Sequence, residues 1–319
     1  MSKILHVLSA YLGLTQVDLK RIIATAPRRY KVYPIEKKNG GFREIAQPSR
    51  ETKAMQRVLV DHFLQNLPIH VAATAYKDDA SVAKNAFAHA GGTPILKMDF
   101  REFFPSIHGG DWANYCRMNG IFEEEDIAVS QNILFRRAKG EKTLKLSIGA
   151  PSSPLISNAL LFAFDQIIQR EADKRNIRYT RYADDITFSG QRIGMLKDME
   201  KAVAEAVRQT KSPRLTINEE KTTYVTTAHR RFVTGVVLSN QGSISLGHQR
   251  KRTISARVHH AMLGRLDPRE LAELAGTLAF VKVVEPDFLT RLVQKYGVET
   301  IEKIKKAPRV KRRSRFLQE

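Results

Sequence analysis

The stretch Tyr179-Thr-Arg-Tyr-Ala-Asp-Asp-Ile-Thr-Phe188 sets two adjacent aspartates, Asp184 and Asp185, among β-branched and aromatic residues. Such residues favour a pleated strand, in which neighbouring side chains point to opposite faces. A tight turn at the pair would remove that restriction and present both carboxylates at the tip of a hairpin. With a third acid from elsewhere, the pair would form a site for hard divalent cations. The alternative is an ordinary solvated turn, which aspartates also favour.

The composition narrows the classes of partner. Of the 319 residues, 53 are Lys or Arg and 33 are Asp or Glu, so the formal net charge is +20. An excess of this size favours a polyanionic partner, with nucleic acid the leading candidate and an anionic membrane surface the second. The single cysteine, Cys116, excludes an internal disulfide framework and a cysteine-based zinc cluster. Because no apolar run approaches the roughly 20 residues of a membrane span and no signal peptide is visible, we expect a cytoplasmic protein.

Apolar periodicity and turn residues predict alternating strands and helices. Ser153-Pro154 predicts an N-cap followed by proline at the first position of a central helix. An antiparallel hairpin in the middle of such an alternation favours an α+β fold, with helices on one face of a sheet. Helices are expected over 1–26, 51–67, 81–90, 124–138, 154–175, 192–209 and beyond 248; strands over 94–100 and 214–225; and hairpins over 30–47, 179–188 and 232–246, the last with Asn240-Gln-Gly at its turn.

A third carboxylate is available at the end of a predicted strand. In Ile95-Leu-Lys-Met-Asp-Phe-Arg-Glu-Phe-Phe104, alternation places Leu96, Met98 and Phe100 on one face and Asp99 on the other. An acid at the exit of such an apolar strand is either a cap for the next segment or a metal ligand. The pairing with Asp184 and Asp185 favours the ligand.

Seven short blocks, in this order along the chain, resemble those of a reverse transcriptase of the bacterial retron type. The resemblance covers roughly residues 30–260 and implies a right-hand polymerase fold with fingers, palm and a short helical thumb. The general polymerase blocks are Phe42-Arg43 with Gln47-Pro48, Asp99 with Phe103-Phe104, Gly149-Ala-Pro-Ser-Ser-Pro154, Tyr182-Ala-Asp-Asp185 and Leu215-Thr-Ile-Asn-Glu-Glu-Lys221, and the retron-like blocks are Asn85-Ala-Phe-Ala-His89 and Val233-Thr-Gly235.

The resemblance implies a division of the chain and a catalytic centre. The expected segments are a helical lead-in (1–29), fingers (30–93), palm with fingers elements interleaved (94–231), palm end and thumb (232–302), and a basic tail (303–319). Asp99 and Asp184 would hold two Mg²⁺ ions, with Mn²⁺ as a substitute, and Asp185 would complete the acidic cluster. The backbone at Phe100 would help to hold metal and phosphate. One ion would lower the pKa of the primer hydroxyl, and the other would bind the triphosphate.

Further residues are implied in binding the incoming dNTP. Arg43 would grip the triphosphate with a bidentate fork and Lys37 as a point charge, although a lysine before Gly-Gly is also an ordinary turn residue. Phe104 is either a core aromatic or the steric gate that excludes a ribonucleotide. Lys221 is either a surface lysine or the donor of a proton to pyrophosphate.

The small residues Gly149 and Ala150 would let template and nucleotide approach the backbone. One departure from the family pattern stands beside them. Ile148 occupies the place of a usual glutamine, so a polar contact near the nucleotide is missing or supplied otherwise.

The retron-like blocks imply contact with a structured RNA. Asn85 and His89 are four residues apart and share one side of a helix, where they either contact RNA or brace a neighbouring loop. Gly235 would permit close approach of RNA or of another backbone. The basic tail, with eight basic residues in 303–315, is either a solvated arm or a nucleic-acid contact. The expected RNA-binding set is Asn85, His89, Val233, Thr234, Gly235 and, on the helix from His248, Arg250, Lys251, Arg252 and Arg257.

By resemblance, the chain would copy part of its own structured non-coding RNA into multicopy single-stranded DNA, primed from the 2′-OH of a guanosine. Its partners would be that RNA, dNTPs, an RNA–DNA hybrid product and, in anti-phage defence, a separate effector protein. The alternatives are another bacterial reverse transcriptase, of group II intron or diversity-generating type, and a non-catalytic RNA-binding scaffold. The segment after Gly235 has no Cys- or His-rich nuclease cluster, which disfavours the intron type. The intact acids disfavour the scaffold, because clustered carboxylates are costly without a metal.

Overall fold

The chain forms two compact units, each assembled from segments that are distant in the sequence. The computed structural model describes residues 2–37, 40–77, 80–91 and 93–308. The first unit contains Met1–Ala80 and Ile95–Tyr224, and the second contains Ser81–Pro94 and Val225–Glu319. The expected division into five segments stays a prediction, because compactness separates only these two units.

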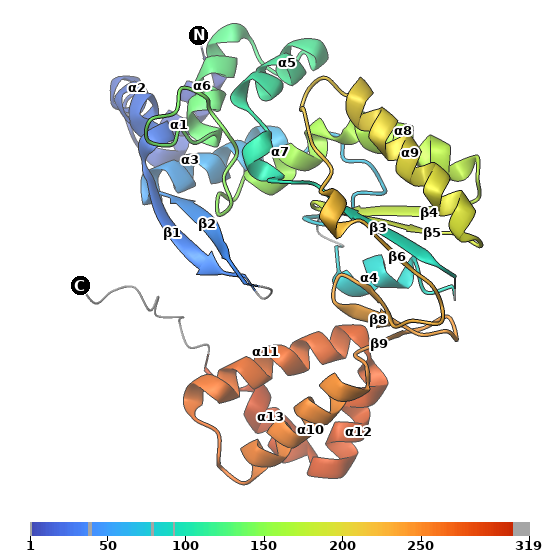
Figure 1. Cartoon of the computed structure of the whole chain (residues 1–319). Coiled ribbons are helices and arrows are strands. Elements are labelled where there is room, and N and C mark those ends of the chain that lie inside the picture. Colours follow the sequence, from blue (N-terminus) through green and yellow to red (C-terminus); the bar gives the residue numbers. More distant parts are fainter. Residues whose placement is uncertain (1, 38–39, 78–79, 92, 309–319) are drawn as a thin grey trace. The chain divides into compact units, whose positions relative to one another are not determined.

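The centre of the first unit is a four-stranded sheet in the order β4-β5-β3-β6. β5 pairs antiparallel with both β3 and β4, so the expected strand 94–100 and hairpin 179–188 both form. Two helices, α8 and α9, pack on this sheet (Figure 1). The bounds are β3 (Ile95–Asp99), β4 (Arg178–Tyr182), β5 (Asp185–Ser189), β6 (Thr223–Val225), α8 (Phe162–Asp173) and α9 (Ile193–Gln209).

The other helices of this unit share one hydrophobic core with the sheet. Leu8, Trp112 and Phe135 are fully buried in it beside Leu96 and Phe188 of the sheet. An antiparallel hairpin with mostly exposed residues, β1–β2, extends from this core. The bounds are α1 (Lys3–Leu12), α2 (Gln16–Thr25), α3 (Arg50–Leu59), α5 (Gly109–Asn119), α6 (Glu124–Leu134), α7 (Ser153–Leu160), β1 (Tyr30–Glu36), β2 (Phe42–Pro48), the π-helical turn η2 (Val60–Leu64) and the 3-10 turns η1 (Ala26–Arg28), η3 (Phe104–Ser106) and η4 (Glu219–Lys221).

Two expected helices are divided in the structure. The lead-in 1–26 is two helices, because Gly13 (φ +64°) ends α1 and the Thr15 side chain caps α2. The expected helix 154–175 breaks at Leu161 into α7 and α8. The cap position of α7 is Ser152 and not Ser153, so that prediction is wrong by one residue.

Other predicted elements are shortened or were not foreseen. The expected strand 214–225 pairs regularly only at its end, as β6, and the expected helix 51–67 finishes in the π-helical turn η2. Helix α5 has no counterpart in the prediction, because it begins with Gly109-Gly110 and so lacks a strong start signal.

The second unit contains a small sheet and a helical bundle. Helix α4 packs on the sheet β7-β8-β9, and each of α10–α13 contacts the other three. The expected hairpin 232–246 is really two hairpins, because Thr234-Gly235 turns the chain before Asn240-Gln-Gly does. The bounds are α4 (Val82–Phe87), β7 (Arg231–Val233), β8 (Val236–Leu238), β9 (Ile244–Ser245), α10 (His248–Met262), α11 (Pro268–Val284), α12 (Pro286–Tyr296) and α13 (Val298–Lys305).

Among the helices of the described residues, none has both the length and the apolar character that crossing a bilayer requires. Of the expected basic tail 303–319, residues 303–305 end α13, and residues 309–319 lie outside the described part of the chain.

Candidate active site

The acidic pair lies at a two-residue hairpin turn. Ala183 and Asp184 connect β4 to β5, and Tyr182 pairs with Asp185 across the turn. Ala183 has φ +59°, a left-handed conformation that costs a residue with a Cβ roughly 1–2 kcal/mol. Because Asp184 is in the turn and not in a strand, strand alternation does not force its side chain away from that of Asp185.

Asp99 ends β3 directly opposite Asp185 in the strand register. It is 7% exposed, and Nζ of Lys221 lies 2.9 Å from its Oδ1. The backbone N–H of Phe100 donates to the carbonyl of Asp184 at 3.2 Å, which ties the end of β3 to the turn. The three carboxylates therefore gather at one end of the sheet.

Burial and mutual repulsion raise the pKa values of both turn carboxyls. For Asp184, burial and then the Asp99 charge raise the pKa, whereas Lys221 and Arg43 act in the opposite direction. For Asp185, burial and then the charges of Asp184 and Asp99 raise the pKa to about 6. A cation bound at this cluster would relieve the repulsion that raises these pKa values.

The donor set suits a hard divalent cation, because partly desolvated carboxylate oxygens are the ligands that Mg²⁺ prefers. The arrangement is not preformed: among the described residues, no three His, Cys, Asp or Glu side chains converge to hold an ion. The Lys221 ammonium instead contacts one oxygen of Asp99. The protein alone thus offsets part of the acidic charge with a lysine, and these side chains would have to reorient to bind a metal ion.

A cavity of about 650 Å³ lies beside this cluster and is lined by Asp99 and Asp184. Its volume falls in the range of small-ligand sites. The half-buried Phe104 ring lies 5.3 Å from the ring of Phe103, so it belongs to an aromatic cluster as well as to the cavity wall. The predicted site residues that line the cavity besides the two acids are Lys37, Arg43, Phe100, Phe104 and Lys221.

The expected small-residue pair lies against β2. A Cβ added at Gly149 (φ +120°) would come 3.1 Å from the carbonyl oxygen of Ala46. The Ala46 N–H also donates to the carbonyl of Ile148 at 2.8 Å, and Ile148 lines the cavity. Close packing on β2 and the positive φ thus both favour glycine at this position. Approach of a nucleotide to Gly149 and the buried Ala150 stays a prediction.

The two retron-like blocks meet in the second unit. Thr234 (φ +47°) and Gly235 (φ +78°) form the β7–β8 turn. The Thr234 hydroxyl donates to the carbonyl of Val82 at 3.2 Å, and Nδ2 of Asn85 lies 3.5 Å from that hydroxyl. These described contacts join the turn to α4. Asn85 and His89 are buried, at 1% and 0% exposed.

RNA contact by these blocks stays a prediction. No described atom lies within 4 Å of a Cβ built at Gly235. Glycine is therefore needed there for its positive φ and not for close approach of another described segment. Val233 is fully buried, whereas Gly235 is exposed.

The basic residues of α10 divide by their contacts. Lys251 pairs with Glu285, and Arg257 donates to the carbonyl of Glu270 at 3.0 Å. Arg250 is exposed and lies over the Phe280 ring at 4.5 Å. Arg252 is exposed too. Their expected contact with RNA phosphates stays a prediction, strongest for the exposed pair.

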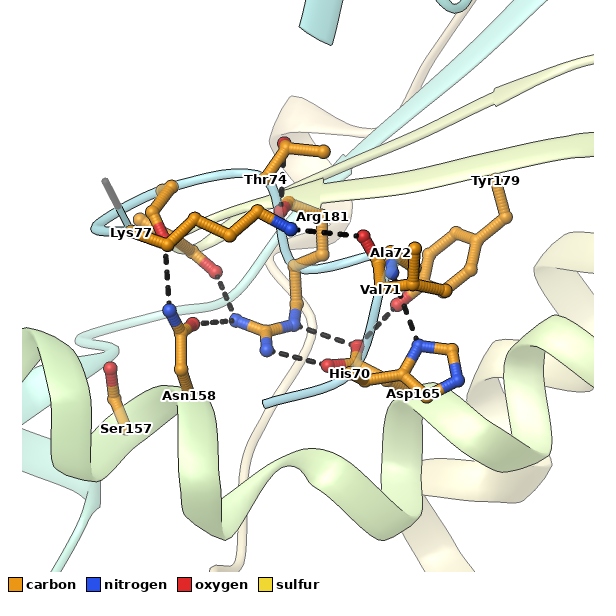
Figure 2. A network of polar contacts seen from close by, with 12 residues as sticks. His70, Val71, Ala72, Thr74, Lys77, Ser157, Asn158, Asp165, Tyr179 and Arg181 are labelled. Carbon is orange, nitrogen blue, oxygen red and sulfur yellow. Dashed lines mark hydrogen bonds and ion pairs between the residues drawn. The ribbon is translucent and has the colours of Figure 1, made fainter. Parts of the chain in front are cut away.

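Several residues at the site were not foreseen from the sequence. Tyr76 lines the cavity from a backbone with φ +62°. Arg136 also lines it and contacts Glu44 at 2.6 Å. Figure 2 shows a third feature, the buried network around Arg181, with Asn158 and Asp165 from α7 and α8. Two polar residues seven positions apart in an apolar helical stretch were the signal that could have pointed to this network.

Comparison with known proteins assigns the family. The sequence model described as reverse transcriptase (RNA-dependent DNA polymerase) matches residues 35–249. The chain is 38% identical over 280 residues to the retron Ec83 reverse transcriptase of Escherichia coli, covering 87% of this chain and 90% of that protein. It is 31% identical over 310 residues to the retron Ec86 reverse transcriptase of the same species, covering 94% and 93%.

A solved structure of telomerase from Candida albicans, in complex with a TWJ fragment of telomeric RNA, supports the fold. It aligns with a TM-score of 0.50 at 13% identity, over 90% of this chain and 56% of that one. The chain therefore belongs to the reverse transcriptases and is an RNA-directed DNA polymerase. Within that class it is a bacterial retron reverse transcriptase. The expected fold class and family are confirmed.

Proposed function

We propose that this enzyme copies part of a structured non-coding RNA into multicopy single-stranded DNA by two-metal nucleotidyl transfer. The observation that carries the proposal is the acidic cluster of Asp99, Asp184 and Asp185. Asp99 and Asp184 line a nucleotide-sized cavity, and Asp185 lies opposite Asp99 in the strand register. The kinship with retron reverse transcriptases supports a dedicated RNA as template and primer. Within the fold, residues 30–93 would serve as fingers, 94–231 as palm and 232–302 as palm end and thumb.

The reaction joins the primer hydroxyl oxygen to the α-phosphorus of a dNTP and breaks the bond to pyrophosphate. Two Mg²⁺ ions held by the carboxylates would lower the pKa of the primer hydroxyl and neutralise the triphosphate. Asp99 and Asp184 would carry the ions, and Asp185 would add negative charge beside them. Lys221, now on Asp99, would be released from that carboxylate and give its proton to the departing pyrophosphate.

Cavity residues would set the choice of nucleotide. Arg43 and Lys37 line the cavity with positive charge and would bind the triphosphate. The Phe104 ring would lie under the sugar, where a 2′-OH would collide with it. The enzyme would thus select dNTPs over ribonucleotides, and Phe104→Ala would relax that selection in a primer-extension assay.

The net charge of +20 supports a nucleic-acid partner. The exposed Arg250 and Arg252 would contact phosphates of the RNA or of the RNA–DNA hybrid. Priming would use the 2′-OH of a guanosine in the RNA, which gives a branched product.

The test is to purify the protein from cells that carry its native upstream region and to analyse the nucleic acid that copurifies. Wild type should carry a short DNA joined to RNA. The variant with Asp184→Asn and Asp185→Asn should carry the RNA without DNA. RNA without DNA in both samples would contradict the proposal.

A role in anti-phage defence, exerted in the cytoplasm through a separate effector protein, is the wider part of the proposal. Kinship with retron enzymes supports it. Cells with the complete locus should plate phage less efficiently than cells whose enzyme carries Asp184→Asn. Equal plating on both strains across a broad phage panel would contradict the defence role and leave the polymerase proposal intact.

A further inference from the structure

A fully buried arginine lies directly behind the acidic turn. The Arg181 side chain is 0% exposed, and it donates through Nε and Nη2 to the two carboxylate oxygens of Asp165 at 2.8 and 2.6 Å. Its remaining nitrogen, Nη1, donates to Oδ1 of Asn158 at 3.1 Å and to the carbonyl of Ala183 at 3.0 Å. The guanidinium thus connects the α7–α8 helices to the turn itself. Figure 2 shows its contacts with Asn158 and Asp165.

The bond to Ala183 fixes one side of Asp184. The carbonyl that Arg181 contacts belongs to the peptide group before Asp184, and the carbonyl of Asp184 accepts the Phe100 N–H on the other side. Two restrained peptide groups fix the direction in which the Cβ of the residue between them points. Because Ala183 is held at φ +59°, this geometry persists only where neighbouring contacts impose it.

The other partners fix the orientation of the guanidinium. Asp165 also accepts the Tyr179 hydroxyl at 2.6 Å. Burial and then the Asp165 charge raise the pKa of Tyr179 well above its usual value, so the hydroxyl stays protonated and keeps donating. Asn158 and Asp165 hold the planar fork at both ends, which a lysine ammonium could not satisfy in the same geometry.

The same arginine holds a second wall of the cavity through its backbone. Its N–H donates to the carbonyl of Ala72, and its carbonyl accepts the Thr74 N–H, both at 2.8 Å. Nδ2 of Asn158 donates to the carbonyl of Ala75 at 2.9 Å. The next residue is Tyr76, which lines the cavity. The network therefore links the acidic turn to the segment that carries Tyr76.

We propose that Arg181 is a positioning residue that orients Asp184 for divalent-metal binding, with Asn158 and Asp165 holding its guanidinium in place. This inference rests on the proposed two-metal function. The competing account is that the pair with Asp165 serves stability alone. Buried ion pairs can be replaced by apolar pairs of similar size with little loss of stability, so the two accounts make different predictions.

Two variants separate these accounts: one replaces Arg181 alone, and the other replaces Arg181 together with Asp165. Arg181→Lys keeps a cation beside Asp165 and loses the fork. The double variant Arg181→Met with Asp165→Leu replaces the ion pair by an apolar pair and leaves no buried charge unpaired. Arg175→Lys is the matched control, because Arg175 forms an arginine–carboxylate pair with Glu171 at the end of α8, away from the turn.

Three quantities are measured. The first is the Mn²⁺ dissociation constant of the substrate-free protein, obtained by electron paramagnetic resonance. The others are the midpoint of thermal unfolding and the kinetics of primer extension on an RNA template. We expect Mn²⁺ binding at least about tenfold weaker in both Arg181 variants, or roughly 1.4 kcal/mol. We also expect the double variant to have a lower kcat, a KM for dNTP within about threefold of wild type, and a thermal midpoint within a few degrees of it.

The control should match wild type in all three measurements. A folded double variant with wild-type Mn²⁺ affinity and kcat would overturn the positioning role. A wild-type protein that polymerises DNA but binds no Mn²⁺ without substrate would also overturn it. A wild-type protein with neither Mn²⁺ binding nor polymerisation would overturn the two-metal proposal itself, and the two failures are thereby distinguishable.

Discussion

Two tight hairpins of this chain hold a residue with a Cβ in the left-handed region, and they anchor it in opposite ways. At the β4–β5 turn, Ala183 is held through its main-chain carbonyl by Arg181. At the β7–β8 turn, Thr234 is held through its own hydroxyl, which donates to Val82. The first arrangement leaves the neighbouring Asp184 side chain to line the cavity, whereas the second uses the turn side chain to bind the protein.

The buried arginines before the two turns differ in the same sense. Arg181 has a carboxylate partner, Asp165. Within the described part of the chain, Arg231 instead contacts the carbonyls of Thr93 and Ser239 and the side-chain oxygen of Asn240. Burial accordingly lowers the pKa of Arg231. In this chain, the turn whose Asp184 side chain lines the cavity is thus backed by an ion pair, and the turn whose Thr234 side chain binds the protein is backed by neutral acceptors.

The largest contrast should be in catalysis. We expect Asp184→Asn to lower the rate of primer extension about 10⁴-fold, or roughly 5 kcal/mol of transition-state stabilisation, because the proposed metal-binding carboxylate is lost. Thr234→Ala, which removes the polar side chain of the other turn, should lower the rate of primer extension on a short synthetic template less than about tenfold. Single-turnover extension measures both rates. Equal losses of rate in the two variants would contradict the proposed difference between the two turns.

The next contrast is in stability. Arg181→Met leaves Asp165 buried without its cation and should cost about 3–5 kcal/mol of unfolding free energy. Arg231→Met leaves its described partners, which are neutral acceptors, unpaired and should cost about 1–3 kcal/mol. Urea unfolding, followed separately in peptides of the two units by hydrogen exchange, measures both values. A larger cost for Arg231→Met would contradict the expectation that the ion-paired arginine contributes more to stability than the arginine with neutral acceptors.

Asp185 should destabilise the metal-free protein at neutral pH. Its pKa rises from the usual 3.8 to about 6 on folding, so the folded state binds more protons between these values and stability falls as the pH rises through them. In EDTA above pH 6, Asp185→Asn should therefore raise the free energy of unfolding by about 1–2 kcal/mol, a value reduced to allow for partial exposure of the carboxyl. Below pH 4 the substitution should leave the free energy of unfolding unchanged. Thermal unfolding across this pH range tests the sign, and a gain that is constant with pH would exclude titration of the Asp185 carboxyl as its cause.

The smallest effects concern the turn residues themselves, and they should have opposite signs. Ala183→Gly removes the left-handed strain and should stabilise the protein by up to about 1 kcal/mol. Thr234→Val keeps the shape, loses the hydroxyl bond to Val82 and should cost about 1 kcal/mol. Chemical denaturation of the two variants against wild type distinguishes the cases.

The sequence was sufficient for the parts of the site that are local. The Asp184-Asp185 pair, the strand that ends at Asp99 and the hairpin around 179–188 follow from short-range pattern. The strand order was not predicted, because no spacing rule pairs two strands that lie so far apart in the chain. Asp99 was proposed as the third acid from its place at the end of a strand, and the family resemblance supported that choice.

The missed features depend on tertiary partners. Ala183 and Thr234 occupy left-handed conformations that their residue types disfavour, so sequence preference predicts glycine there and tertiary contacts override it. From the sequence alone, Arg181 is expected to be an exposed residue of a hairpin. Its burial depends on Asp165, which comes from another element. The turn at Thr234-Gly235 was not predicted, and one long hairpin was expected instead, because Asn240-Gln-Gly is the stronger turn signal.

The most direct test of the central claim is to map where the metal binds. In the purified protein with an RNA template–primer, Fe²⁺ replaces Mg²⁺, and peroxide then cleaves the backbone close to the bound ion. We predict cleavage next to Asp99 and at the 183–185 turn, suppressed by excess Mg²⁺ and absent in Asp184→Asn. Cleavage confined to other segments, or unchanged in Asp184→Asn, would contradict a metal site at this turn.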